Sequence, residues 1–136
     1  MNEHVHPTPE LTRNQSLVMG TLSDAAGPLS AYAILDQLRD DGFRAPLQVY
    51  RALDKLVEFG LVHRLESLNA FVACRQPACE SHEAIAFMIC EKCGLVSEIS
   101  DNPVARRLKQ LAGKAGFALH KSTVELRGIC ATCQAG

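Results

Sequence analysis

The chain has 136 residues, 47% of them hydrophobic and 21% charged, a balance typical of a globular protein with one domain or two small ones. It contains no run of about eighteen apolar residues, so a membrane-spanning helix is excluded and no membrane partner is expected. Residues 1–10 lack the basic and apolar regions of a signal peptide, and we therefore expect a cytoplasmic protein.

The charge balance gives little indication of nucleic-acid binding. The net charge is −1, and residues 1–72 hold nine acidic side chains against six lysines and arginines. A DNA-binding surface usually has an excess of cations, because it has to contact phosphates. Any contact with DNA must therefore depend on the local placement of a few cations, namely Arg13, Arg44, Arg51, Lys55 and Arg64.

Three helices are predicted in the first sixty residues, over 12–22, 30–42 and 45–60. Thr12 and Ser30 are good N-caps, and Gly60 is a natural C-terminal stop. Apolar residues recur at helical spacing and define the faces that we expect to turn inward: Leu17, Val18, Leu22, Ile34, Leu35, Leu38, Val49, Leu53, Leu56 and Val57.

Two short strands follow, over 61–66 and 70–74, with a turn at 67–69. Three helices followed by a two-stranded hairpin is the order of a winged helix-turn-helix, whose third helix lies in the major groove of DNA. A small helical bundle with an incidental hairpin has the same order of elements. Periodicity alone leaves both interpretations open.

A polar connector over 75–83 leads to a second half with a β-β-α-β pattern. We predict a buried strand at 84–90, a second strand at 95–99 and a third at 117–127. Between the last two strands we predict a helix over 104–115, with Leu108 and Leu111 turned inward.

Two Cys-x-x-Cys pairs, Cys90 with Cys93 and Cys130 with Cys133, are the strongest chemical signal in the sequence. Four thiolates can bind one tetrahedral zinc ion, and this spacing lets each pair aim both sulfurs at one point. Disulfides or buried thiols are the alternatives, but the lack of a secretion signal favours a metal. Four protein ligands leave no position for water, so we expect a structural zinc rather than a catalytic one.

Further candidate ligands remain after these four: His63, Cys74, Cys79, His82, Glu98 and His120. A site made of His63, Cys74, His82 and Glu98 would join both halves of the chain at one cation, and its mixed donors suit zinc. Such a site would favour one arrangement of the halves and so couple metal concentration to DNA affinity. Cys79 could replace Cys74 or Glu98 or be a free thiol, and His120 is expected at the surface.

The chain also carries a set of short motifs spread over residues 11–134: Ser30-Ala31-Tyr32, Gln48-Val49-Tyr50-Arg51-Ala52-Leu53, Gly60-Leu61-Val62-His63-Arg64-Leu65-Glu66-Ser67, Cys90-Glu91-Lys92-Cys93-Gly94, Gly116-Phe117-Ala118-Leu119 and Gly128-Ile129-Cys130-Ala131-Thr132-Cys133. In this combination they resemble the ferric uptake regulator family, and most closely its zinc uptake regulator branch.

The resemblance implies an α+β fold with three parts: a winged helix-turn-helix DNA-binding domain (1–74), a hinge (75–83) and a C-terminal α/β dimerisation and metal-binding domain (84–136). It implies a homodimeric repressor that binds palindromic operators in double-stranded DNA when loaded with zinc, and that represses zinc-uptake genes. It also implies two Zn²⁺ ions per subunit. The structural ion would be held by Cys90, Cys93, Cys130 and Cys133, and the regulatory ion by His63, Cys74, His82 and Glu98.

In the DNA-binding domain, the family motif falls on Tyr50 and Arg51 in the third helix, and Tyr32 falls where the family often has a DNA-facing aromatic residue. Arginine can donate to guanine, and a tyrosine ring can pack against a thymine methyl group. Lys55 and Arg64 are our own candidates for phosphate contacts, with a solvated surface as the alternative.

Three questions stay open. Two dimers could share one operator, and Asp36 and Arg39 on the second helix are candidates for a contact between them. A regulator that senses iron, manganese or peroxide is an alternative, although Cys74 argues against a peroxide-sensing iron site. An enzyme is not expected, because neither cysteine pair is predicted to open a helix after a strand and no other catalytic motif is present.

Overall fold

A computed structural model describes residues 10–74, 85–100, 102–120 and 122–136. The chain divides into two compact units, an N-terminal unit (Met1–Cys74) and a C-terminal unit (Arg75–Gly136). The predicted connector, 75–83, lies outside the described residues. No helix in the described part of the chain is both long and apolar enough to span a membrane.

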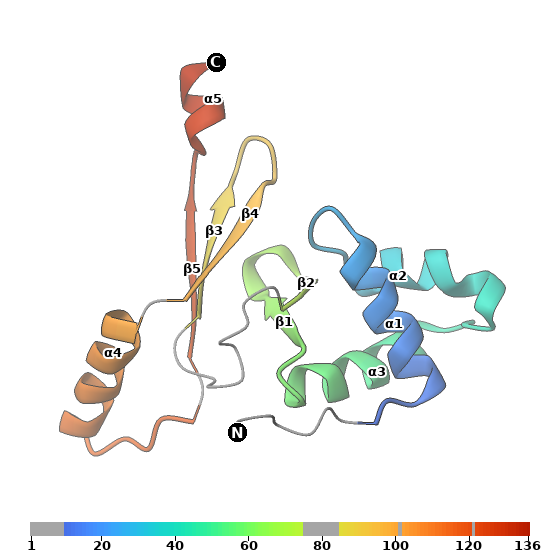
Figure 1. The fold of residues 1–136 in the computed structure, drawn as a ribbon, viewed down its shortest axis with the longest axis horizontal. Helices are drawn as coiled ribbons and strands as arrows, with labels where there is room; N and C mark the ends of the chain where they lie inside the picture. Colours follow the sequence, from blue (N-terminus) through green and yellow to red (C-terminus); the bar gives the residue numbers. More distant parts are fainter. Residues whose placement is uncertain (1–9, 75–84, 101, 121) are drawn as a thin grey trace, which may run out of the picture. The chain divides into compact units, whose positions relative to one another are not determined.

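The N-terminal unit consists of three helices and a two-stranded hairpin, which confirms the winged helix-turn-helix prediction (Figure 1). Its elements in chain order are α1 (Arg13–Asp24), α2 (Ala31–Leu38), the 3-10 turn η1 (Arg39–Asp41), α3 (Pro46–Glu58), β1 (Val62–Leu65), the 3-10 turn η2 (Glu66–Leu68) and β2 (Ala70–Ala73). The helix predicted to reach Gly60 ends two residues earlier, because Gly60 adopts a left-handed φ of 79°.

Side-chain caps fix the start of the first two helices, as predicted. The hydroxyl of Thr12 accepts from the N–H of Gln15 at 3.2 Å, and the Gln15 side chain accepts in return from the N–H of Thr12 at 3.0 Å. This reciprocal capping box uses two N–H groups that the helix cannot satisfy itself. At α2, the hydroxyl of Ser30 accepts from the N–H of Ala33 at 3.1 Å.

One face of α3 forms the centre of the N-terminal core. Val49, Leu53 and Leu56 are fully buried, and they pack with apolar residues of α1, α2 and the hairpin, including Val18, Leu22, Ile34, Leu35, Leu38, Phe43, Val62 and Phe71. The opposite face of α3, which carries Arg51 and Lys55, is exposed. The predicted inward faces are therefore confirmed for this unit, with Leu17 and Val57 at the edge of the core.

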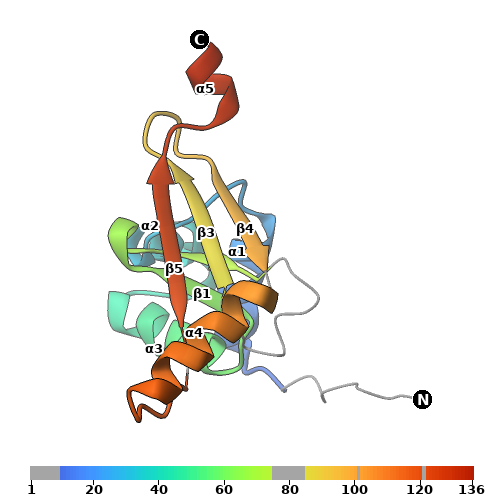
Figure 2. The ribbon, with the colours of Figure 1, turned by 90° about the vertical axis from the view of Figure 1, so that its left-hand side faces the viewer.

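The C-terminal unit is a three-stranded sheet with two helices. Its elements are β3 (Ile85–Cys90), β4 (Val96–Ser100), α4 (Asn102–Lys114), β5 (Thr123–Gly128) and α5 (Ala131–Ala135). The strand order is β4-β3-β5, with β3 antiparallel to β4 and parallel to β5. The three strands lie side by side in Figure 2, with α4 and α5 at opposite ends of the sheet. The predicted α+β class is confirmed.

The strand predicted at 117–127 is wrong over its first half. Phe117 is 64% exposed, and its N–H donates to the carbonyl of Ala112 at 2.9 Å. Gly116 has a φ of 70°, and its N–H donates to the carbonyl of Gly113 at 3.0 Å. This hydrogen-bond pair is a Schellman motif, so residues 116 and 117 close α4 instead of opening a strand.

Two other predictions for the C-terminal unit are corrected. The strand at 84–90 is not buried throughout, because Met88 is 44% exposed, whereas Phe87, Ile89 and Cys90 are buried. Leu111 of α4 is 47% exposed and does not turn inward. Both corrections concern apolar residues that a single copy of this unit leaves uncovered.

One face of the sheet is both apolar and exposed. The ladder pairs Met88 with Leu126 on β5 and with Ser97 on β4, and side chains opposite one another lie on the same face. Leu95 and Ile99 follow on that face by alternation, and all four apolar residues are exposed by 37% or more. Met88, Leu95 and Leu126 line a groove of about 470 Å³.

We predict that Leu53→Ala destabilises the N-terminal unit by about 2–5 kcal/mol, because it leaves a cavity in a fully buried site. Leu47→Ala, the same change at a position of α3 that is 57% exposed, is the matched control and should stay within about 0.5 kcal/mol of wild type. The two tyrosines, Tyr32 and Tyr50, both lie in this unit and tryptophan is absent, so tyrosine fluorescence during urea unfolding reports on it alone. Equal shifts for the two variants would contradict the assigned core.

Candidate metal centre and nucleic-acid interface

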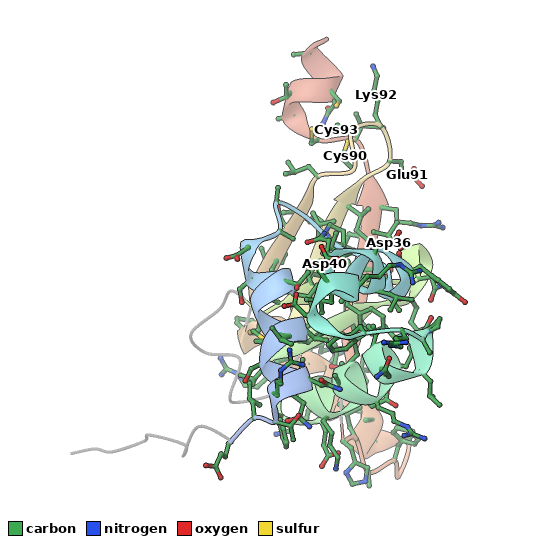
Figure 3. All side chains as sticks on the ribbon, turned by 90° about the vertical axis from the view of Figure 1, so that its right-hand side faces the viewer. Asp36, Asp40, Cys90, Glu91, Lys92 and Cys93 are labelled. Atoms are coloured by element: carbon green, nitrogen blue, oxygen red, sulfur yellow. The ribbon has the colours of Figure 1, made fainter. Side chains whose placement is uncertain are left out.

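The four cysteines of the two Cys-x-x-Cys pairs come together at one end of the C-terminal sheet. Cys90 ends β3, and Cys93 lies in the turn that follows, as Figure 3 shows. On the parallel neighbour β5, Gly128 lies opposite Cys90, so the chain leaves that strand beside the first pair. Cys130 and Cys133 then follow at the start of α5.

The positions of the sulfurs fit a single zinc ion. All four Sγ atoms lie within 4.8 Å of one another, and those of Cys93 and Cys130 are 3.8 Å apart. A tetrahedral site with Zn–S bonds of about 2.3 Å has sulfur–sulfur edges of about 3.8 Å. The four free thiols therefore satisfy the geometry of a closed site with four cysteine ligands.

Backbone groups already favour a thiolate at Cys90. The N–H groups of Cys130 and Cys93 donate to its sulfur at 3.3 and 3.4 Å. These two hydrogen bonds lower the pKa of Cys90 to about 6. The side-chain hydrogen bond with Cys130 and the loss of hydration raise the pKa of Cys133 to about 12. A divalent cation would supply the positive charge that four adjoining thiolates need, and would release the remaining protons.

The second cysteine pair differs from the prediction in one respect. Cys130 is the N-cap of α5, which follows β5 after a gap of two residues, so this pair does open a short helix after a strand. Its two thiols nevertheless share one cluster with Cys90 and Cys93, and they do not form an isolated redox pair. A closed site with four protein ligands has a structural role and no open position for a substrate.

The N-terminal unit contributes a second pair of candidate ligands. His63 on β1 and Cys74, directly after β2, have donor atoms within 4.8 Å of each other. The hairpin explains this, because Val72 lies opposite His63 and the N–H of Cys74 donates to the carbonyl of Leu61 at 2.9 Å. His63 is a buried polar residue, only 7% exposed.

Of the other two predicted ligands of this set, one belongs to the C-terminal unit and one lies outside the described residues. Glu98 is a half-buried residue of β4 in the C-terminal unit, opposite Phe87, and His82 is outside the described residues. The sulfur of Cys74 is in a disulfide bond. A cysteine binds zinc as a thiolate, so the predicted role of Cys74 requires reduction of this disulfide. Cys79 also lies outside the described residues.

Of the predicted DNA contacts, Tyr32 and Arg51 are both exposed. Tyr32 on α2 is 62% exposed, and Arg51 projects from the exposed face of α3. Arg51 makes no ion pair within the part of the chain that the structure describes. It lines a polar groove of about 610 Å³ between α3 and the start of α1. Tyr50, by contrast, is half-buried and packs against the core.

The two predicted phosphate contacts have partners within the protein. The Lys55 ammonium is 3.4 Å from the carboxylate of Glu58. The Arg64 guanidinium is 3.5 Å from the carboxylate of Glu66 and lies 5.8 Å from the centre of the Phe71 ring. These pairs are exposed and therefore weak, so a phosphate could replace the carboxylate at either cation.

Sequence reasoning missed the role of Gln48. Its side-chain oxygen accepts from the backbone N–H groups of Arg44 and Ala45, at 2.6 and 3.0 Å. Gln48 thus caps the helix in which it stands, three residues after Ala45, where a glutamine can reach back to the first free N–H groups. The spacing of a capping box would have indicated this role, but Ala45 lacks the side chain that normally completes it.

The comparisons with known proteins agree with this arrangement. The model of the ferric uptake regulator family matches residues 11–127. The zinc uptake regulation protein of Escherichia coli (strain K12) is 41% identical over 124 residues, which cover 90% of this chain and 72% of that protein.

Two solved structures also match. The crystal structure of holo XcZur is 41% identical, with a TM-score of 0.82 over 93% of this chain and 87% of that one. A zinc uptake regulator complexed with zinc and DNA is 39% identical, with a TM-score of 0.82 over 93% of this chain and 84% of that one.

We predict that Cys133→Ser loses the tightly held zinc of the cysteine cluster and destabilises the C-terminal unit, because three thiolates cannot close the site. Native mass spectrometry of the reduced protein would give the zinc count, and hydrogen exchange the stability of β3 and β5. Cys74→Ser is the matched control, since it removes a thiol from outside the cluster and should leave the exchange protection of β3 and β5 unchanged. A Cys133→Ser protein that keeps this zinc and its exchange protection would contradict the assignment.

Proposed function

The chain belongs to the ferric uptake regulator family, and we propose that it is a zinc-responsive transcriptional repressor. In this proposal the zinc-loaded homodimer binds palindromic operators in cytoplasmic DNA and represses genes for zinc uptake. The observation that carries the proposal is the 41% identity with a zinc uptake regulation protein over 90% of the chain. Because the members of this family are regulators, the thiol-enzyme hypothesis is excluded.

Zinc is the metal that the donor atoms favour. The cysteine cluster offers only thiolates, and the second predicted set offers a thiolate, two imidazoles and a carboxylate. Thiolates select zinc over the harder cations, whereas manganese prefers oxygen ligands. A sensor of iron, manganese or peroxide remains the second candidate for this family, and Cys74 argues against the peroxide sensor among them.

Each subunit would bind two zinc ions. The structural ion is assigned to Cys90, Cys93, Cys130 and Cys133, whose sulfurs match the edge length of a tetrahedral site. The regulatory ion is assigned to His63, Cys74, His82 and Glu98. Support for this second site comes from the short distance between the donor atoms of His63 and Cys74 and from the burial of His63.

The regulatory ion would act as a switch because its ligands come from both units. His63 and Cys74 belong to the N-terminal unit, and Glu98 belongs to the C-terminal unit. A cation that needs ligands from both would stabilise one arrangement of the units over all others. In a dimer, that arrangement would set the spacing between two copies of α3, and DNA half-sites about one helical turn apart require a fixed spacing.

DNA would be bound by the exposed face of α3 together with the start of α2. Arg51 is the candidate for a guanine contact, because it is exposed and free of carboxylate partners among the described residues. Tyr32, Lys55 and Arg64 would contact the flanking backbone, where hydrogen bonds to phosphate fix the position of the protein. Tyr50 would support α3 from its half-buried position more than it contacts bases.

A second copy of the chain would cover the apolar face of the C-terminal sheet. Met88, Leu95, Ile99 and Leu126 are exposed on one face, and a contiguous apolar surface of this kind marks a protein–protein interface. The family acts through dimers, and a palindromic operator mirrors the twofold symmetry of a dimer.

Two dimers on one operator would meet through α2. Asp36 on α2, labelled in Figure 3, and Arg39, which begins η1 directly after α2, form an exposed ion pair at 3.1 Å. An exposed pair within one chain contributes little stability, so exchanging partners with the same pair of a neighbouring dimer costs little. Such an exchange would produce cooperative binding.

We predict that zinc, under reducing conditions, raises the affinity of wild-type protein for DNA selected from a randomised duplex library, and that Cys74→Ser loses this response while keeping its fold and dimer. The physical reason is the loss of one ligand from the switch. Gel shifts against buffered zinc, iron(II) and manganese(II), with metal content per subunit, provide the measurement. Cys79→Ser is the matched comparison; if it loses the response and Cys74→Ser keeps it, the ligand assignment is wrong.

We predict that Leu126→Asp breaks the dimer, because it introduces a charge into the apolar sheet face. The expected result is a monomer in sedimentation velocity that still carries the zinc of the cysteine cluster. Leu68→Asp is the matched control, since Leu68 is a similarly exposed leucine, at 40%, in the N-terminal unit. If Leu126→Asp sediments as the wild-type dimer does, the interface lies elsewhere.

A further inference from the structure

Leu47 is a large apolar side chain that the N-terminal core does not explain. It is 57% exposed on α3, whereas the leucines of the opposite face, Leu53 and Leu56, are fully buried. It is also not among the partly buried residues that pack against the core. Single exposed leucines are common on protein surfaces, so exposure alone does not indicate a binding role. The position of Leu47 on the helix does.

Leu47 occupies the part of α3 that would enter the DNA groove most deeply. It is the second residue of the helix, and the N-terminal residues of a recognition helix are those that contact base edges. Arg51, the candidate for a guanine contact, lies four residues further on and therefore one turn along the same face. The two side chains would thus face neighbouring base pairs.

The neighbouring polar residue, Gln48, is not available to contact a base in the DNA groove. Gln48 would be the natural adenine reader, because a glutamine amide can bond to adenine through both its oxygen and its nitrogen. Its oxygen, however, already accepts from the N–H groups of Arg44 and Ala45. Turning it toward a base would leave two N–H groups at the start of α3 without their cap. An apolar side chain is thus the group that the first turn of α3 presents to DNA.

The C5 methyl group of thymine is the one apolar feature that the base edges present in the major groove. We propose that Leu47 contacts the methyl group of one thymine in each operator half-site and so determines sequence specificity at that base pair. This inference rests on the proposed function and extends it from Arg51 to a second base position. Leu47 would disfavour cytosine there because cytosine lacks the methyl group, and guanine because its N7 and O6 acceptors would lie against the apolar side chain.

The test is a double-mutant cycle that combines two changes, the substitution of Leu47 in the protein and the removal of one thymine methyl group from the DNA. Duplexes would first be selected from a randomised library by zinc-loaded wild-type protein. Each thymine of a half-site would then be replaced in turn by deoxyuridine, which lacks only the methyl group, and the affinities of wild type, Leu47→Ala and Leu47→Met would be measured. Leu47→Met keeps a large apolar side chain and is the matched control.

At one thymine position we expect the loss of the methyl group to weaken wild-type binding about fourfold per half-site, the effect of exposing one buried methyl group. Leu47→Met should show the same discrimination at that position. Leu47→Ala should bind thymine and deoxyuridine duplexes equally, with its tyrosine-fluorescence unfolding transition unchanged.

Two results would overturn the inference. If Leu47→Ala distinguishes thymine from deoxyuridine as wild type does at every position, or if wild type distinguishes them nowhere, Leu47 does not contact a thymine methyl group. If zinc-loaded wild type selects no sequence at all, the proposed function fails along with the inference. One set of duplexes therefore distinguishes the expected result, failure of the inference alone and failure of the proposed function.

Discussion

The parallel pairing of β3 with β5 is the constraint on which the cysteine cluster depends. The register places Gly128 opposite Cys90, so the two strands end side by side although 37 residues separate these positions along the chain. Cys130 follows two residues later, and its N–H donates to the sulfur of Cys90 at 3.3 Å. A shift of one residue in this register would turn the side chains of β5 to the other face of the sheet and move Cys130 away from Cys90. The sheet therefore brings the four cysteines together, and a cation bound to them would in turn stabilise the pairing of β3 with β5.

In the N-terminal unit, α3 has one face buried in the core and an opposite face that is exposed. Its buried face is fixed by fully buried apolar residues such as Leu53, which tie it to α1 and α2. Its other face carries Leu47 and Arg51 and makes no contribution to that core, so its residues can vary without loss of packing. In the proposed function these residues would vary with the operator sequence. The cap formed by Gln48 fixes the start of the helix and with it the height at which these side chains would meet a DNA groove.

The sequence predicted well whatever depends on local chemistry. The caps at Thr12 and Ser30 and the four-cysteine cluster follow from residue type and spacing, and the structure contains all of them. Burial was predicted well in the N-terminal unit and poorly in the C-terminal unit. Met88 and Leu111 are apolar at regular spacing, but such a pattern cannot tell a core from a surface that a second subunit covers. The start of β5 was missed because the helix cap before it uses N–H groups that a strand would otherwise pair.

The two units also differ in when they can form as the chain leaves the ribosome. The N-terminal unit is complete by Cys74 and is built mainly from helices that contact their neighbours in sequence, which is typical of rapid folding. The central strand of the other unit, β3, cannot pair with β5 until β5 has been synthesised, and the four cysteines of the cluster are not all present before Cys133. The helices of the N-terminal unit can thus fold early in synthesis, whereas the cysteine cluster can form only after Cys133 has been added.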